Sequence, residues 1–152
     1  MIKATASEIP QIKDSAFIGL RGRKEQAVKD CLVISAEKFC QDQEKLPDYA
    51  LKSLADSLAI IKGADIDDIL IKLLRKSSSY YFQVSCHIIK VLATREGEKI
   101  EQTIIQWLLS AKEEMKWAKE NENDRICGAD CKKGLNEYAS TLEFLKSKGI
   151  YY

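Results

Sequence analysis

The sequence predicts an all-α protein of about seven helices, arranged as a short stack of antiparallel helix pairs or as a compact helical bundle. Apolar residues recur at helical spacing through most of the 152 residues, and no segment shows the apolar–polar alternation typical of a strand. Two prolines and seven glycines leave most of these periodic segments uninterrupted. We expect one helical domain spanning residues 1–152.

The first three helices are predicted over residues 7–20, 24–41 and 47–62. Pro10 and Pro47 lie near helix starts, where a first turn tolerates proline, and Gly63 lies where a C-cap glycine belongs. The inward positions expected for the second and third helices are Val28, Cys31, Leu32, Ser35, Phe39, Leu51, Leu54, Ala55, Leu58 and Ile61.

The fourth and fifth helices are predicted over residues 65–76 and 80–97. The fourth begins with aspartates and ends with basic residues, which matches the helix dipole at both ends. The fifth is apolar around roughly two thirds of its circumference, which favours a helix packed between other helices. We expect the core where these two helices meet to contain Leu73, Leu74, Ile88 and Leu92, and the wide apolar face to begin at Tyr81.

The last two helices are predicted over residues 98–118 and 126–148. A hydrophilic segment, residues 120–124, separates them and is expected to be a loop. The inward positions are Ile100, Ile104, Leu108, Ala111, Met115 and Ala118 in the sixth helix and Cys131, Leu135, Tyr138, Leu142 and Leu145 in the seventh.

Charge and composition limit the classes of partner. Lysine and arginine number 24 and aspartate and glutamate 23, so the net charge of about +1 lacks the basic excess usual for proteins that bind nucleic acids or anionic membranes. No apolar run approaches a membrane span, and the N-terminal residues show no signal peptide. Five cysteines without framework-like spacing favour free thiols in a reducing compartment, so we expect a cytoplasmic protein.

An internal repeat relates the central helices. A shift of 34 residues superposes Ala50, Leu54 and Leu58 on Val84, Ile88 and Leu92. Leu70-x-x-Leu73-Leu74, a short turn and the apolar segment 84–92 resemble a HEAT-like helical repeat over roughly residues 48–115. The segment lacks the usual proline of the first helix and the Asp and Arg of the turn. The resemblance implies a curved stack of helix pairs that binds proteins or nucleic acids.

Two surfaces are candidates for partner binding. The first is a narrow polar strip on the fifth helix, which the repeat extends to the third helix and which Tyr49 and Tyr80 flank. Its residues are Ser53, Asp56, Gln83, His87, Lys90 and Thr94. The second is the basic loop, defined as Arg21, Arg23 and Lys24, which precedes a helix and is a possible contact for a phosphate or a nucleic acid. For each surface, an ordinary solvated face or loop is the alternative.

The sequence supports no catalytic or metal site. Cys127 and Cys131 could join Cys86 and His87 around zinc, but their spacing also fits buried thiols on an apolar helix face. His87 is the only histidine and has no carboxylate at helical spacing to orient its ring. The aspartates at the start of the fourth helix are explained by the helix dipole. We therefore expect no enzyme, no metal and no cofactor.

The leading hypothesis is a non-enzymatic, helical protein–protein interaction module or complex subunit. The alternative is a nucleic-acid-associated small helical subunit of a ribonucleoprotein or a CRISPR-type effector complex, using the basic loop with Lys72, Arg75 and Lys76. In its general pattern and in its ending, Leu142-Glu143-Phe144-Leu145-Lys146, the chain resembles small helical subunits of CRISPR effector complexes. The partner, the pathway and the oligomeric state are not specified by the sequence.

Overall fold

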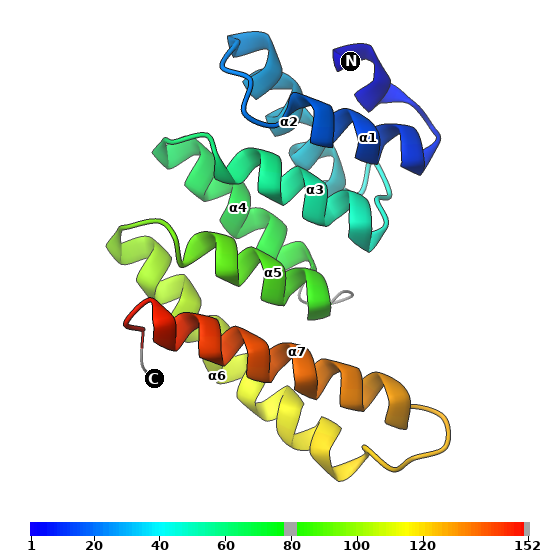
Figure 1. Ribbon diagram of the computed structural model, residues 1–152, viewed down its shortest axis with the longest axis vertical. Coiled ribbons are helices and arrows are strands. Elements are labelled where there is room, and N and C mark those ends of the chain that lie inside the picture. Colours follow the sequence, from blue (N-terminus) through cyan, green and yellow to red (C-terminus); the bar gives the residue numbers. More distant parts are fainter. Residues whose placement is uncertain (78–81, 151–152) are drawn as a thin grey trace. The chain divides into compact units, whose positions relative to one another are not determined.

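The computed structural model describes residues 1–77 and 82–150, and within these ranges it contains seven α-helices and no strand (Figure 1). The all-α prediction is therefore confirmed. Tyr80 and Tyr81, for which the sequence predicts positions, lie outside the described residues. The elements are the 3₁₀ helix η1 (Ile2–Ala6) and the helices α1 (Pro10–Leu20), α2 (Gln26–Cys40), α3 (Asp48–Ala59), α4 (Ala64–Ser77), α5 (Phe82–Leu92), α6 (Glu98–Glu120) and α7 (Gly128–Ser147).

The chain divides into two compact units, Met1–Val91 and Leu92–Tyr152. The first unit contains η1, α1 to α4 and α5 except for its last residue. The second contains the α6–α7 helical hairpin, in which the two helices pack against each other. The expectation of a single domain over residues 1–152 stays a prediction.

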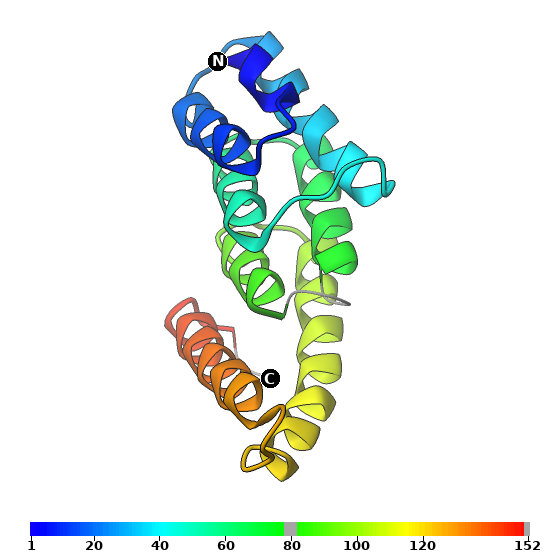
Figure 2. The same cartoon turned by 90° about the vertical axis from the view of Figure 1, so that its right-hand side faces the viewer.

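The first unit has two layers of helices. Figure 2 shows α1, α3 and α5 in one layer and α2 and α4 in the other. Helix α1 packs on α3, α2 packs on α4, and α3 also contacts α2 and α4. In α1–α3 and in α2–α4, a helix thus packs on the next helix but one, within its own layer. This arrangement is compatible with a stack of helix pairs, while the HEAT-like resemblance itself stays a prediction.

Helical periodicity identified most of the core. Ala50, Leu54 and Leu58 of α3 are buried, and so are their three repeat equivalents in α5, Val84, Ile88 and Leu92. In α4 and α6 the predicted inward residues are likewise buried. In α7, however, Leu135, Tyr138 and Leu142 are only half-buried, because within the hairpin α7 packs on one neighbouring helix.

One element was not anticipated from the sequence. Helix η1 packs on α1 and α2, and the Met1 side chain lies so close to Gly19 that a Cβ there would be 2.0 Å from the Met1 sulfur. Five residues are too few to show a helical repeat of apolar positions, so no periodic signal marks this element. In the described part of the chain, no helix is both long and apolar enough to cross a membrane.

Ile88→Ala should lower the free energy of unfolding by about 2–5 kcal/mol, because the Ile88 side chain is 1% exposed and its truncation leaves a cavity. Gln83→Ala, on the half-buried strip of the same helix, is the matched control and should change stability by less than about 0.5 kcal/mol. Chemical denaturation measures both values. Equal losses of unfolding free energy in the two variants would contradict the assignment of Ile88 to the buried face of α5 and Gln83 to its polar strip.

Candidate functional site

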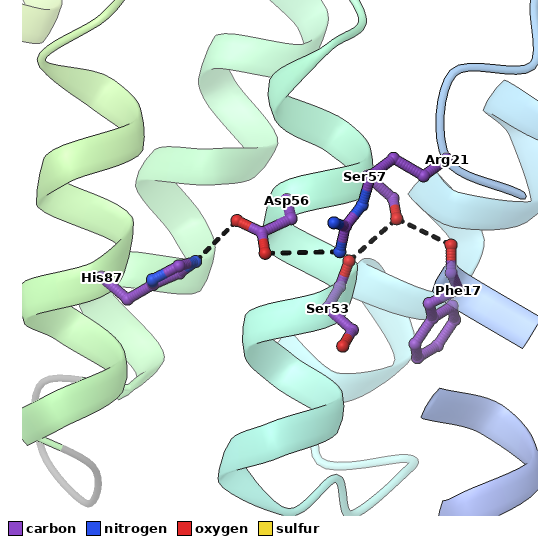
Figure 3. Close-up of polar contacts among 6 residues, drawn as sticks. All are labelled: Phe17, Arg21, Ser53, Asp56, Ser57 and His87. Atoms are coloured by element: carbon purple, nitrogen blue, oxygen red, sulfur yellow. Dashed lines mark hydrogen bonds and ion pairs between the residues drawn. The ribbon is translucent and has the colours of Figure 1, made fainter. Parts of the chain in front are cut away.

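The carboxylate of Asp56 joins three helices of the first unit. Arg21, the residue after α1, places Nη2 3.3 Å from Asp56 Oδ2, while His87 of α5 places Nε2 2.7 Å from Asp56 Oδ1. Figure 3 shows Asp56 on α3 between the other two side chains. Asp56 is thus the centre of a polar network that runs from Arg21 to His87 across the α1–α3–α5 layer; we call it the Asp56 network.

A buried hydroxyl next to Asp56 fixes α3 against α1. Ser57 is almost fully buried, and its Oγ lies 2.8 Å from the carbonyl oxygens of both Phe17 and Ser53, as Figure 3 shows. A buried hydroxyl needs such an acceptor to offset the loss of water. The contact with Phe17 sets the position of α3 along α1, and it thereby brings Asp56 within reach of Arg21.

The Asp56 network is partly open to solvent. The side chains of Arg21, Asp56 and His87 are 36%, 34% and 30% exposed, respectively. An ion pair with this exposure, such as Arg21–Asp56, contributes about 0.2–1 kcal/mol, because water and salt screen it. The network therefore orients side chains on the surface more than it stabilises the fold.

The structure brings together part of the predicted polar strip. Asp56 and His87 are in direct contact, and Ser53, Gln83 and Lys90 are also half-buried on α3 and α5. Thr94 is exposed, follows α5 and belongs to the second unit, so it is not grouped with the others here.

The basic loop is joined to this strip through Arg21. Arg23 and Lys24 are exposed, and neither makes an ion pair within the described part of the chain. Gly22 has φ +77°, a left-handed conformation that glycine adopts readily and that lets the chain turn away after α1. The two surfaces predicted separately from the sequence therefore meet at Asp56.

A signal for the contact between Arg21 and Asp56 is present in the sequence. The two residues are 35 positions apart, close to the repeat spacing that relates the later helices. The apolar repeat is weak in the first helix, so it gave no reason to align Arg21 with the strip. That Asp56 orients the His87 ring was also missed from the sequence. A carboxylate was sought on the helix that carries His87, whereas Asp56 lies on α3.

An aspartate that accepts a hydrogen bond from a histidine ring also occurs in general acid–base sites. Within the described part of the chain, the hydrogen-bond partner of the His87 ring is the Asp56 carboxylate, not a hydroxyl or a thiol. Arg21, on the other side of the carboxylate, makes the arrangement an ion-pair network. The geometry suits recognition of a polar or charged group on a binding partner.

The cysteines are all free thiols. Cys86 and Cys131 are buried, while Cys31, Cys40 and Cys127 are half-buried. No group of three or more histidine, cysteine, aspartate or glutamate side chains suited to a metal ion is present among residues 1–77 and 82–150. The absence of a metal in the native protein stays a prediction.

Cys127, at the start of α7, is held as a protonated thiol. Partial burial, the hydrogen bond to Asp124 and the neighbouring Cys131 raise the pKa of Cys127 to about 11. Asp124 Oδ1 also accepts hydrogen bonds from the backbone N–H groups of Ile126 and Cys127, and these lower the pKa of Asp124. The Asp124 carboxylate is therefore charged at neutral pH and opposes formation of the thiolate.

Comparison of the chain with protein-family models, with curated proteins and with solved structures gave no match.

A double-mutant cycle of Arg21→Met and Asp56→Asn should give a coupling free energy of about 0.2–1 kcal/mol, which falls as sodium chloride is added. The matched cycle of Arg23→Met and Asp56→Asn should give a value near zero, because Arg23 does not contact Asp56. Thermal or chemical unfolding supplies all the values. Equal coupling in the two cycles would contradict a specific Arg21–Asp56 pair.

Asp124→Asn should speed alkylation of Cys127 at about pH 8, well below the thiol pKa. The substitution removes a negative charge and so lowers that pKa, which raises the fraction of reactive thiolate. Mass spectrometry of each cysteine-containing peptide gives the individual rates. The rate at buried Cys86 is the internal control and should not change, and an unaltered Cys127 rate would be evidence against the influence of Asp124.

Proposed function

We propose that this chain is a non-enzymatic interaction module that binds a partner protein through one face of the first unit. This surface, the α1–α3–α5 face, comprises exposed or half-buried residues of three neighbouring helices and the residues that follow α1 and α3. Its members are Ile18, Arg21, Tyr49, Ser53, Asp56, Ile60, Gln83, His87 and Lys90.

The observation that carries the proposal is the Asp56 network beside exposed apolar side chains. Ile18 on α1 and Ile60 at the end of α3 are 51% and 54% exposed, and Tyr49 on α3 is also exposed. Protein interfaces combine apolar anchors, often including tyrosine, with polar groups held in fixed positions. Arg21, Asp56 and His87 supply donors and an acceptor whose positions are fixed before any partner arrives.

The ion pairs favour a protein partner over a nucleic acid. Arg21 forms an ion pair with Asp56. Lys29 Nζ lies 2.7 Å from Asp65 Oδ2, and Lys76 Nζ lies 2.5 Å from Asp42 Oδ1. A phosphate would have to compete with a carboxylate of the chain for each of these cations, which weakens the electrostatic attraction that dominates nucleic-acid binding. Arg23 and Lys24 remain as a short basic segment.

The proposal includes a cytoplasmic location and a stack of helix pairs. Five free thiols are compatible with a reducing compartment. Helices α1, α3 and α5 lie in one layer, and such a layer is compatible with stacked helix pairs, which build extended binding surfaces.

The partner is identified by quantitative mass spectrometry of proteins that co-purify with the tagged chain. Ile60→Glu with Lys90→Glu should deplete the specific partner at least tenfold, which corresponds to about 1.4 kcal/mol. The matched control, Leu109→Glu with Lys112→Glu, changes one exposed apolar residue and one exposed lysine on α6 and should retain the partner. Circular dichroism should show that both variants are folded.

Arg21→Glu with Arg23→Glu separates the two classes of partner. The proposal would be contradicted by two results together. The first is that this variant loses the salt-sensitive retention on a nucleic-acid column that the parent shows. The second is that Ile60→Glu with Lys90→Glu still binds the protein partner. That result would favour the ribonucleoprotein alternative.

A further inference from the structure

A second candidate site lies at the N-terminal end of the first unit, away from the residues of the α1–α3–α5 face. It is a groove of about 970 Å³ bounded by η1, residues 7–8, Lys13 of α1, one face of α2 and residues 43–45; we call it the N-terminal groove. Helix η1 packs on both α1 and α2 and forms one wall, and Figure 2 shows it (dark blue) next to these helices. The volume is at the upper end of the range for ligand sites.

The wall and the floor of the groove are fixed by polar contacts. Thr5 Oγ1 donates a hydrogen bond to the carbonyl oxygen of Ile2 at 2.7 Å and lies 3.0 Å from the sulfur of Cys31 on α2. On the opposite side, Lys13 is only 8% exposed and forms an ion pair with Glu44. These contacts tie η1 to α2, and α1 to the loop before α3, so the groove exists before a ligand binds.

The lining combines exposed apolar residues with a cationic rim. Ile2 and Ile34 are 41% and 52% exposed, although both face a concave surface. Lys38 lies one helical turn after Ile34, so α2 presents an isoleucine and a lysine side by side along the groove.

Charge in the groove is weighted toward cations. Three lysines of the lining, Lys3, Lys38 and Lys45, and two carboxylates, Glu8 and Asp30, are exposed, whereas Glu44 is held by Lys13. Four lysines line the groove against three carboxylates, those of Glu8, Asp30 and Glu44. Burial lowers the pKa of Lys13, and the positive charge of Lys38 lowers it further.

We propose that the N-terminal groove binds an acidic, amphipathic peptide segment of a partner protein. The apolar side chains of the peptide contact Ile2 and Ile34, and its carboxylates pair with Lys38 and Lys45. The size of the groove fits several residues of a peptide and exceeds what one side chain would fill. The spacing of isoleucine and lysine along α2 suits a segment in which apolar and acidic residues lie close together. This site is independent of the α1–α3–α5 face.

The test uses a short fluorescent peptide of alternating leucine and glutamate, with a peptide of alternating leucine and lysine as the control probe. Fluorescence anisotropy should show saturable binding of the acidic peptide only. Lys38→Glu should weaken that binding at least tenfold and Ile34→Ser should also weaken it, whereas Lys133→Glu, the same charge change on an exposed part of α7, should leave it unchanged. Circular dichroism confirms that each variant is folded.

Cys31 gives a second readout because its side chain lines the groove. Bound acidic peptide should slow alkylation of Cys31, while the rate at Cys127 in the second unit should stay the same. The assignment is overturned by an absence of saturable binding, by equal binding of the basic peptide, or by unchanged affinity in Lys38→Glu. Loss of affinity in Ile60→Glu with Lys90→Glu would instead place the peptide on the α1–α3–α5 face and would also overturn it.

Discussion

The first unit depends on the complete burial of the apolar face of α3. Ala50, Leu54, Ala55 and Leu58 are fully inaccessible to water, and α3 contacts α1, α2 and α4. Burial of apolar surface is the main favourable contribution to folding, and small residues such as Ala50 and Ala55 let neighbouring helices approach closely. Because α3 has neighbours in both layers, its position determines where the polar residues on its outer side lie.

Both candidate sites follow from this packing. Asp56 is two residues from buried Leu54 and Leu58, so the docking of α3 carries its carboxylate to a point between α1 and α5. The N-terminal groove arises where the packing is less complete, because the short η1 covers only part of α1 and α2. The same packing thus leaves a polar network on one surface of the first unit and an open groove on another.

Sequence periodicity predicted the helices and most of their inward faces, because apolar spacing reports directly which side of a helix avoids water. It could not predict which helices become neighbours. The contacts of Asp56 with Arg21 and His87 depend on the alignment of three helices, and the burial of Lys13 depends on a loop that supplies Glu44. In the candidate site, sequence analysis therefore found the residues but not the network that joins them.

Because Asp56 has two partners, the three positions are not equivalent during evolutionary change. Loss of Arg21 or of His87 leaves one pair intact, whereas loss of Asp56 first removes both pairs and leaves Arg21 and His87 with no carboxylate between them, so they repel each other whenever the imidazole is protonated. Substitution in diverging relatives should therefore begin at position 21 or 87 and reach position 56 last. Aspartate at position 56 with a changed residue at one of the other two positions would be the common intermediate, and the reverse combination would be rare.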